Sequence, residues 1–243
     1  MAVINSLNNF RVLKWHKLKN KTHRDKQNLF IAEGYHLVSE AHKTGHLKEL
    51  ITTDKSSSFD VETYQVTHNV MEKLSTMATP TKVLGICHQK QETEYGNRLL
   101  LVDQIHHPGN LGTIIRSAVA FGLDTIAINK SVDIYNQKVI QSTQGMIFHI
   151  NVIKTPLEDF IPELKKQDYQ IIGTDVKEGL DIRVVKTKEK WAVLMGNEGD
   201  GLDDSLLGMC DIKVTIKMNE KCESLNVGVA AGIILYSLQK HSV

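Results

Sequence analysis

Three short segments in the second half of the chain combine glycine, asparagine and charged residues in a way that suits ligand binding. The first is His106-His-Pro-Gly-Asn-Leu-Gly112, which opens a helical pattern containing Arg116. Its glycines permit a tight turn and close backbone approach, and Asn110 is a residue type that caps helices. Free N–H groups at such a helix start suit a phosphate or a carboxylate. A capped helix with a surface arginine would show the same pattern, so this segment alone leaves both interpretations open.

The second segment is Gly196-Asn-Glu-Gly-Asp-Gly201, which directly follows an apolar run ending at Met195. It fits neither the dinucleotide-binding fingerprint nor the Walker loop. Its acids and the two that follow it could bind a divalent cation, although their spacing differs from that of a calcium-binding loop. A metal-dependent phosphoryl-transfer enzyme is therefore one hypothesis, and a glycine-rich turn with exposed acids is the plain alternative. The acids are Glu198, Asp200, Asp203 and Asp204.

The third segment, residues 218–226, joins the last predicted strand to the last predicted helix. We expect Ser224 to cap that helix and Asn226 to lie in its first turn. Ser224 lacks the surroundings of a nucleophile elbow, and Cys222 has no identifiable histidine partner. The adjacent His106 and His107 lack a third ligand at metal spacing, so no metal site is predicted.

Strands and helices alternate around these segments. The continuous apolar runs 99–102 and 191–195 predict strands covered on both faces. Further strands are expected near 125–129, 148–153, 169–174 and 212–216, with helices near 111–122, 135–143, 156–167 and 224–240. The pattern predicts a mainly parallel sheet with helices on both faces, whose ligands gather at the carboxyl ends of the strands. The last helix is apolar nearly all round, so we expect it to be buried.

The first 90 residues show the same alternation on a smaller scale. Helices are expected near 5–19, 34–44 and 69–77, with strands near 29–32, 48–52, 63–67 and 83–88. This pattern predicts a small α/β sandwich. The polar stretch 89–98 is typical of a linker, so we expect an N-terminal domain over 1–90 and a second domain over 97–243.

Positive charge is concentrated at the N-terminus. The first 30 residues hold seven Lys and Arg against Asp25 alone, while the remainder of the chain carries an excess of acids. Such a segment on a mildly acidic body predicts contact with a polyanion. Trp15 lies within it and could either stack on a base or anchor the helix in the core. The seven cations are Arg11, Lys14, Lys17, Lys19, Lys21, Arg24 and Lys26.

The composition excludes several classes of protein. With 41% hydrophobic and 23% charged residues, the chain has an ordinary globular balance. No apolar run reaches the roughly 18 residues that a membrane span needs, and the N-terminus lacks the features of a secretory signal. The three cysteines have no paired spacing, which favours a reducing cytoplasm.

Taken together, the three segments resemble the signature motifs of the SpoU/TrmH family of RNA ribose 2′-O-methyltransferases, in the SPOUT superfamily. The resemblance rests on Asn110-Leu-Gly-Thr-Ile-Ile-Arg-Ser-Ala118, Gly196-Asn-Glu-Gly-Asp-Gly-Leu202, Ile216-Lys-Met218 and Ser224-Leu-Asn-Val227, and it covers about residues 97–241. Leu29-Phe-Ile-Ala-Glu-Gly-Tyr35 and the following helix are similar to the family's N-terminal substrate-binding domain, a ribosomal-protein-like α/β sandwich.

The resemblance implies a knotted, mainly parallel α/β catalytic domain, a homodimer, an RNA substrate and S-adenosylmethionine as methyl donor, with no metal and no membrane contact. It places cofactor contacts at Thr174, Met195, Gly196, Ile216, Met218 and Leu225. It places catalytic and RNA-facing roles at Asn110, Arg116, Glu198, Ser224 and Asn226. The seven N-terminal cations would then grip the RNA backbone beyond the target nucleotide.

The resemblance leaves the substrate open. A separate N-terminal domain favours ribosomal RNA, while a tRNA 2′-O-methyltransferase and a non-catalytic RNA-binding or ribosome-assembly protein are the alternatives. Two positions depart from the family pattern. Lys217 stands where the family often has proline, and Gly228 stands where it often has serine.

Overall fold

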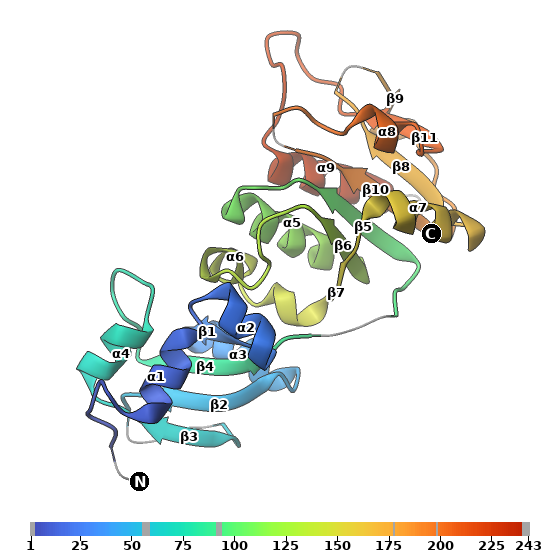
Figure 1. The fold of residues 1–243 in the computed structure, drawn as a ribbon. Coiled ribbons are helices and arrows are strands. Elements are labelled where there is room, and N and C mark those ends of the chain that lie inside the picture. Colours follow the sequence, from blue (N-terminus) through green and yellow to red (C-terminus); the bar gives the residue numbers. More distant parts are fainter. Residues whose placement is uncertain (1–2, 55–58, 91–93, 177, 198, 240–243) are drawn as a thin grey trace. The chain divides into compact units, whose positions relative to one another are not determined.

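The computed structural model describes residues 3–54, 59–90, 94–176, 178–197 and 199–239, and its ribbon is shown in Figure 1. The chain forms two compact units. One consists of residues 1–90 together with 133–149, and the other of 91–132 together with 150–243. Each unit is described by itself.

The first unit contains a mixed four-stranded sheet in the order β1-β4-β2-β3. Strand β4 runs antiparallel to β1 and β2, and β2 runs parallel to β3. Helices α1 and α4 pack together, and the side chains of Val12, Trp15, Val70 and Leu74 lie in the core beneath them. The strands are β1 (Leu29–Glu33), β2 (Leu47–Thr52), β3 (Glu62–Gln65) and β4 (Val83–His88), and the helices are α1 (Phe10–Lys17), α2 (Lys21–Gln27), α3 (Tyr35–Lys43) and α4 (His68–Leu74).

The basic N-terminal segment forms two short helices. The helix expected near 5–19 is the shorter α1, and α2 was not expected. Each helix starts at an asparagine cap. The side chain of Asn9 accepts a hydrogen bond from the amide of Arg11, and that of Asn20 accepts one from the amide of Thr22. An asparagine side chain that caps the following turn competes with continuation of the preceding helix, which explains the break at Asn20.

Residues 133–149 pack on the sheet of the first unit, although the chain reaches them from the second. They include α6 (Gln137–Thr143) and the 3₁₀ helix η1 (Met146–His149). The Gln137 side-chain amide donates to the Ile31 carbonyl at 3.0 Å, and Arg24 is paired with Asp133 at 2.5 Å. The rings of Phe30 and Phe148 are stacked. The first unit is therefore not one continuous stretch of chain.

The second unit contains a seven-stranded sheet in the order β7-β6-β5-β10-β8-β11-β9, in which every pairing is parallel. The predicted parallel α/β class is confirmed. Strand β10 is buried along its whole length and β5 from Leu99 to Asp103, as the apolar runs 191–195 and 99–102 indicate. The strands are β5 (Arg98–Asp103), β6 (Thr125–Asn129), β7 (Asn151–Lys154), β8 (Gln170–Thr174), β9 (Leu180–Asp181), β10 (Trp191–Met195) and β11 (Ile212–Thr215). The helices are α5 (Pro108–Ala120), α7 (Leu157–Lys166), α8 (Asp204–Leu207) and α9 (Val227–Gln239), with the 3₁₀ helix η2 (Ile182–Val184).

Helices α5 and α9 lie against each other. A Cβ added at Gly228 would lie 3.0 Å from Cγ2 of Thr113, so the glycine that departs from the family pattern allows this close approach. The expectation that α9 is buried all round is wrong. Val229, Ile233 and Tyr236 are 50%, 37% and 49% exposed, because α5 and η2, which pack against α9, cover only part of the helix. Of the helices that the structure describes, none is long and apolar enough to cross a bilayer.

Candidate active site

A cavity of about 610 Å³ lies at the carboxyl ends of β8, β10 and β11. All six residues to which the resemblance assigns cofactor contacts line it, namely Thr174, Met195, Gly196, Ile216, Met218 and Leu225. Ser224 lines it as well. The parallel pairing explains this meeting. Leu194 of β10 is paired with Gly173 of β8, and Val214 of β11 with Thr174, so the three strands end at the same edge of the sheet.

The loop after β10 is held in a narrow turn. Asn197 and Gly201 exchange backbone hydrogen bonds, and the Asn197 side-chain oxygen accepts from the amide of Gly199 at 2.7 Å. A Cβ added at Gly196 would lie 2.1 Å from the Gly201 carbonyl oxygen, and Gly201 has a φ of +78°. Both positions therefore require glycine. Glu198 lies outside the described residues.

The same loop is tied to the ends of β5 and β6 through Gln104, which the sequence analysis missed. The Asn197 side-chain amide donates to the Gln104 carbonyl at 3.2 Å, and the Gln104 amide donates to the carboxylates of Asp103 and Asp203. Asp103 is only 1% exposed and accepts a second bond, of 2.8 Å, from Asn129. An acid directly after the apolar run 99–102 was the available signal, because a buried carboxylate needs hydrogen-bond donors around it.

The first and third segments meet at a pair of asparagines. The Asn226 side-chain amide donates to the Asn110 side-chain oxygen at 3.0 Å, across 116 positions of sequence. The capping predictions were wrong in detail. Helix α5 begins at Pro108 with His107 as its N-cap, so Asn110 lies in the first turn. Pro108 explains this, because proline is favoured at the first helical position.

Asn226, instead of Ser224, caps α9. The helix begins at Val227, and the Asn226 side-chain oxygen accepts from the amides of Gly228 and Val229 at 3.0 and 3.4 Å. Ser224 lies before the helix, and its carbonyl accepts a hydrogen bond from the Cys222 thiol. Asn226 thus uses its oxygen to cap α9 and its amide to bind Asn110.

Arg116 lies on α5, is exposed, and is not among the residues that line the cavity. It follows Thr113 by one helical turn, and Thr113 lies against Gly228 of α9. Arg116 therefore borders the partly exposed surface that α5 and α9 share. Leu225 and Val227, on either side of Asn226, line the cavity, whereas Arg116 faces solvent in the single chain.

The structure sorts the seven N-terminal cations into two groups. Four have partners within the fold: Arg11 with Tyr64, Lys19 with two backbone carbonyls, Lys21 with Asp25, and Arg24 with Asp133. Burial also lowers the pKa of Lys19. Lys14, Lys17 and Lys26 are exposed and make no hydrogen bond or ion pair with any residue that the structure describes. These three remain available to a polyanion.

Trp15 is a core residue and cannot stack on a base. Its side chain is 2% exposed, its indole N–H donates to Glu49 at 2.8 Å, and its ring packs edge-on against Tyr64. The core interpretation of Trp15 is confirmed, and the stacking interpretation is wrong.

Comparison with known proteins identifies the family. The model of the SpoU rRNA Methylase family matches residues 97–236. The chain belongs to the SpoU rRNA Methylase family. A second model, of the MRM3-like substrate binding domain, matches residues 9–85, so the N-terminal unit of this SpoU-family chain also has a counterpart.

Several known proteins resemble this SpoU-family chain over nearly its whole length. The 23S rRNA (guanosine(2553)-2′-O)-methyltransferase RlmP of Bacillus subtilis is 36% identical, and the match covers 98% of this chain and 100% of that protein. The crystal structure of an AdoMet-bound rRNA methyltransferase from Sinorhizobium meliloti is 28% identical, with a TM-score of 0.89 over 100% of this chain and 98% of that one. The SpoU methyltransferase AviRb from Streptomyces viridochromogenes, 24% identical with a TM-score of 0.85 over 96% and 98%, shares the fold.

The cavity of this SpoU-family chain fits a cationic, partly apolar ligand. None of the described lining residues is Lys, Arg or His, whereas Asp175, Asp200, Asp204 and Glu223 are among them. Apolar walls come from Leu202, Leu207, Val214 and Ile234. A polyphosphate would meet carboxylates here without a compensating cation, while a sulfonium ligand with an amino group would be attracted to them.

The described residues hold no group of three or more His, Cys, Asp or Glu side chains placed to bind a metal ion. The described carboxylates that follow β10 are therefore not part of such a metal-binding group. The cavity's own chemistry, with backbone groups of a glycine loop and apolar side chains, is that of an organic cofactor site.

Proposed function

We propose that this chain transfers a methyl group from S-adenosylmethionine to a ribose 2′-hydroxyl of ribosomal RNA. The observation that carries the proposal is the cavity at the ends of β8, β10 and β11, lined by the glycine loop and adjoining the asparagine pair. The family and the two long relatives support the reaction type and the substrate class. The enzyme is therefore an S-adenosylmethionine-dependent RNA 2′-O-methyltransferase.

The residues around the cavity suit the methyl donor. The six lining residues Thr174, Met195, Gly196, Ile216, Met218 and Leu225 would hold it, largely through loop backbone next to apolar side chains. When bound, S-adenosylmethionine supplies an activated methyl group on a cationic sulfur. The narrow turn at Gly196 and its tie to Gln104 fix the loop before the donor arrives, so less ordering entropy is lost on binding.

The substrate-facing roles belong to the residues beside the cavity. Asn110 and Asn226 fix each other and orient the ribose, and Ser224 lines the pocket. Arg116 holds the target phosphate or the ribose through charge-assisted hydrogen bonds. The role that the resemblance assigns to Glu198 falls on a residue outside the described ranges. Holding the two reactants in line supplies roughly 7–11 kcal/mol of a bimolecular barrier.

A homodimer would cover the exposed surface of α9. Val229, Ile233 and Tyr236 follow one another at helical spacing on one face and are each more than a third exposed. Exposed apolar patches of this kind mark association surfaces, and a twofold-symmetric contact places the same patch on both copies. Such a dimer would also enclose Arg116, which borders this surface. Ile233→Glu should then sediment as a monomer, whereas a variant that stays dimeric would exclude this interface.

The basic segment would bind the RNA backbone beyond the target nucleotide. Lys14, Lys17 and Lys26 are the members free to do so, and each phosphate contact that is lost should reduce the salt dependence of RNA binding by about 0.7–0.9 in log–log slope. A ribosomal RNA substrate also favours location in the cytoplasm.

Loss of Arg116 tests the proposal. We expect Arg116→Ala to abolish methyl transfer to ribosomal RNA from cells lacking the gene, while S-adenosylmethionine binding in isothermal titration survives. Lys213→Ala, which removes an exposed cation on β11, is the matched control and should stay active. Full activity of Arg116→Ala would remove its role, and failure of the wild-type chain to bind the donor would refute the proposed function. Methylation of tRNA but not ribosomal RNA would replace the substrate class.

A further inference from the structure

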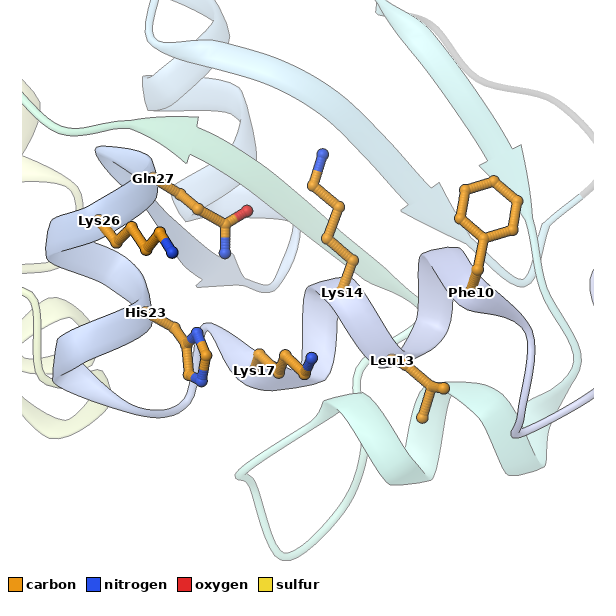
Figure 2. Close-up of a pocket in the computed structure, with 7 residues that line it drawn as sticks. All are labelled: Phe10, Leu13, Lys14, Lys17, His23, Lys26 and Gln27. Carbon is orange, nitrogen blue, oxygen red and sulfur yellow. The ribbon is translucent and has the colours of Figure 1, made fainter.

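A second concave surface lies on α1 and α2, outside the catalytic unit. It encloses about 470 Å³ between one face of each helix (Figure 2). Its α1 residues recur at helical spacing, as do those of α2. The lining residues are Phe10, Leu13, Lys14 and Lys17 of α1, and His23, Lys26 and Gln27 of α2.

This pocket contains the three free lysines of the basic segment. In Figure 2, Phe10 lies at one end and Lys26 with Gln27 at the other, with Lys14 and Lys17 between them. No acid is among the seven lining residues. The cations that have partners in the fold, such as Arg24 and Lys19, do not line it. The fold has thus placed the three unpaired cations of the N-terminal basic segment around one hollow.

Phe10 gives the pocket an exposed aromatic face. It is 70% exposed, although an aromatic ring normally buries most of its surface. The Arg11 guanidinium lies 5.2 Å from the centre of the Phe10 ring and 4.4 Å from that of Tyr64. Arg11, itself held by Tyr64, therefore supports the Phe10 ring and leaves most of it open to a stacking partner.

An exposed aromatic ring among free lysines matches the chemistry of an unpaired nucleotide. Bases stack on aromatic side chains without sequence preference, and lysines bind the flanking phosphates. A base within a duplex is already stacked and cannot reach such a ring. A membrane surface fits less well, because the broad apolar face of α1, with Val12 and Trp15, is buried in the core.

We propose that the α1–α2 pocket binds an unpaired nucleotide of the RNA substrate, with its base on Phe10 and the neighbouring phosphates on Lys14, Lys17 and Lys26. His23 and Gln27 supply hydrogen-bonding groups for the base edge or the ribose. The identity of the RNA rests on the proposed function, but binding of the nucleotide does not. The pocket thus selects targets whose flanking sequence is single-stranded.

The test uses the full chain and a short single-stranded oligoribonucleotide containing 2-aminopurine, whose fluorescence is quenched on stacking. We expect quenching with the wild type and with Phe10→Tyr, and none with Phe10→Leu, which should bind roughly 5- to 150-fold more weakly. The double variant Lys14→Gln/Lys17→Gln should lower the log–log salt slope by about 1.4. The matched control Lys48→Gln/Lys82→Gln removes two exposed lysines elsewhere in the same unit and should leave the slope unchanged.

Several outcomes would overturn this proposal. The first two are unchanged quenching of the probe by Phe10→Leu and an equal affinity of the wild type for the same sequence in a duplex. The third is an equal fall in the log–log salt slope for both double lysine variants. The fourth is binding to phosphatidylserine vesicles that the Lys14/Lys17 variant loses while its RNA binding persists. In the methylation assay, Phe10→Leu should raise KM for ribosomal RNA and leave kcat and the affinity for S-adenosylmethionine unchanged. A wild-type chain that quenches the probe but methylates no RNA would refute the proposed function alone.

Discussion

The two roles of Asn226 can be separated by substitution. Its side-chain oxygen caps α9, while its amide binds Asn110. Asn226→Ala removes both interactions. Asn226→Ser keeps a capping oxygen but loses the amide, and Asn110→Ala removes the bridge without touching the cap.

The magnitudes follow from these contacts. Loss of a cap costs about 1 kcal/mol, and an exposed hydrogen bond contributes toward the low end of about 0.5–1.5 kcal/mol. Asn226→Ala should therefore lose about 1–2 kcal/mol of unfolding free energy, which lowers Tm by roughly 2–8 °C for a unit of this size. Asn226→Ser and Asn110→Ala should each lose about 0.5 kcal/mol, which is close to the exposed bond alone.

Activity should respond differently from stability. If the asparagine pair positions the ribose, Asn226→Ser and Asn110→Ala should each lower kcat for ribosomal RNA by roughly 2- to 12-fold, the equivalent of one hydrogen bond. The double variant Asn110→Ala/Asn226→Ser should be no slower than either single variant, because both remove the same contact. Single-turnover methyl transfer at saturating donor and thermal unfolding measure the two quantities.

Comparison of the single and double asparagine variants could refute these roles of Asn110 and Asn226 in two ways. Single effects on kcat that multiply in the double variant would show that the two asparagines act independently. A Tm for Asn226→Ser as low as that for Asn226→Ala would show that the side-chain oxygen does not cap α9.

Three further predictions concern other parts of the fold. Arg24→Gln should destabilise the chain by about 3–5 kcal/mol, since it leaves the nearly buried Asp133 carboxylate without its cation and two backbone carbonyls without their donor. Lys26→Gln should change the free energy of urea unfolding by less than about 0.5 kcal/mol, and equal effects of the two variants would contradict the division of the cations. Gly196→Ala should abolish S-adenosylmethionine binding in isothermal titration, because its Cβ would lie 2.1 Å from a backbone oxygen. The control Gly199→Ala should bind normally, because its Cβ would lie 3.4 Å from the nearest atom. Hydrogen bonds from Lys43 and His149 lower the pKa of Glu40 below 4.5. The stability that ionised Glu40 contributes is therefore complete above pH 4.5 and is lost as the pH falls through the lowered pKa. The difference in urea midpoint between wild type and Glu40→Gln should shrink over that pH range, and a constant difference would contradict this prediction.

Much of the fold could be predicted because its signals are local. The apolar runs of β5, β6 and β10 and the turn glycines around 196–201 report on neighbours a few positions away, and these elements lie where the pattern indicated. The short elements β9 and α8 escaped prediction because they carry too few residues to show a period. Helix α2 escaped because its seven residues include no apolar side chain and so show no hydrophobic period.

The candidate site was predictable in its parts but not in its connections. Carryover from the family resemblance selected six residues that line one cavity, whereas Gln104 belongs to no motif and was missed. The capping role expected of Ser224 belongs to Asn226, because serine and asparagine are both good caps and their types alone do not fix where the helix begins.

By itself, the sequence determined the class of sheet, the glycine turns and the chemical types gathered at the strand ends, because backbone propensity and hydrophobic periodicity act over short stretches. Only the tertiary structure decided that Asn226 meets Asn110, that residues 133–149 pack with the first unit, and which of seven N-terminal cations are free. Neighbouring lysines and arginines look alike in sequence. Whether one binds RNA or completes the core depends on a carboxylate or carbonyl such as Asp133, which lies 109 positions from Arg24 and is brought there by folding alone.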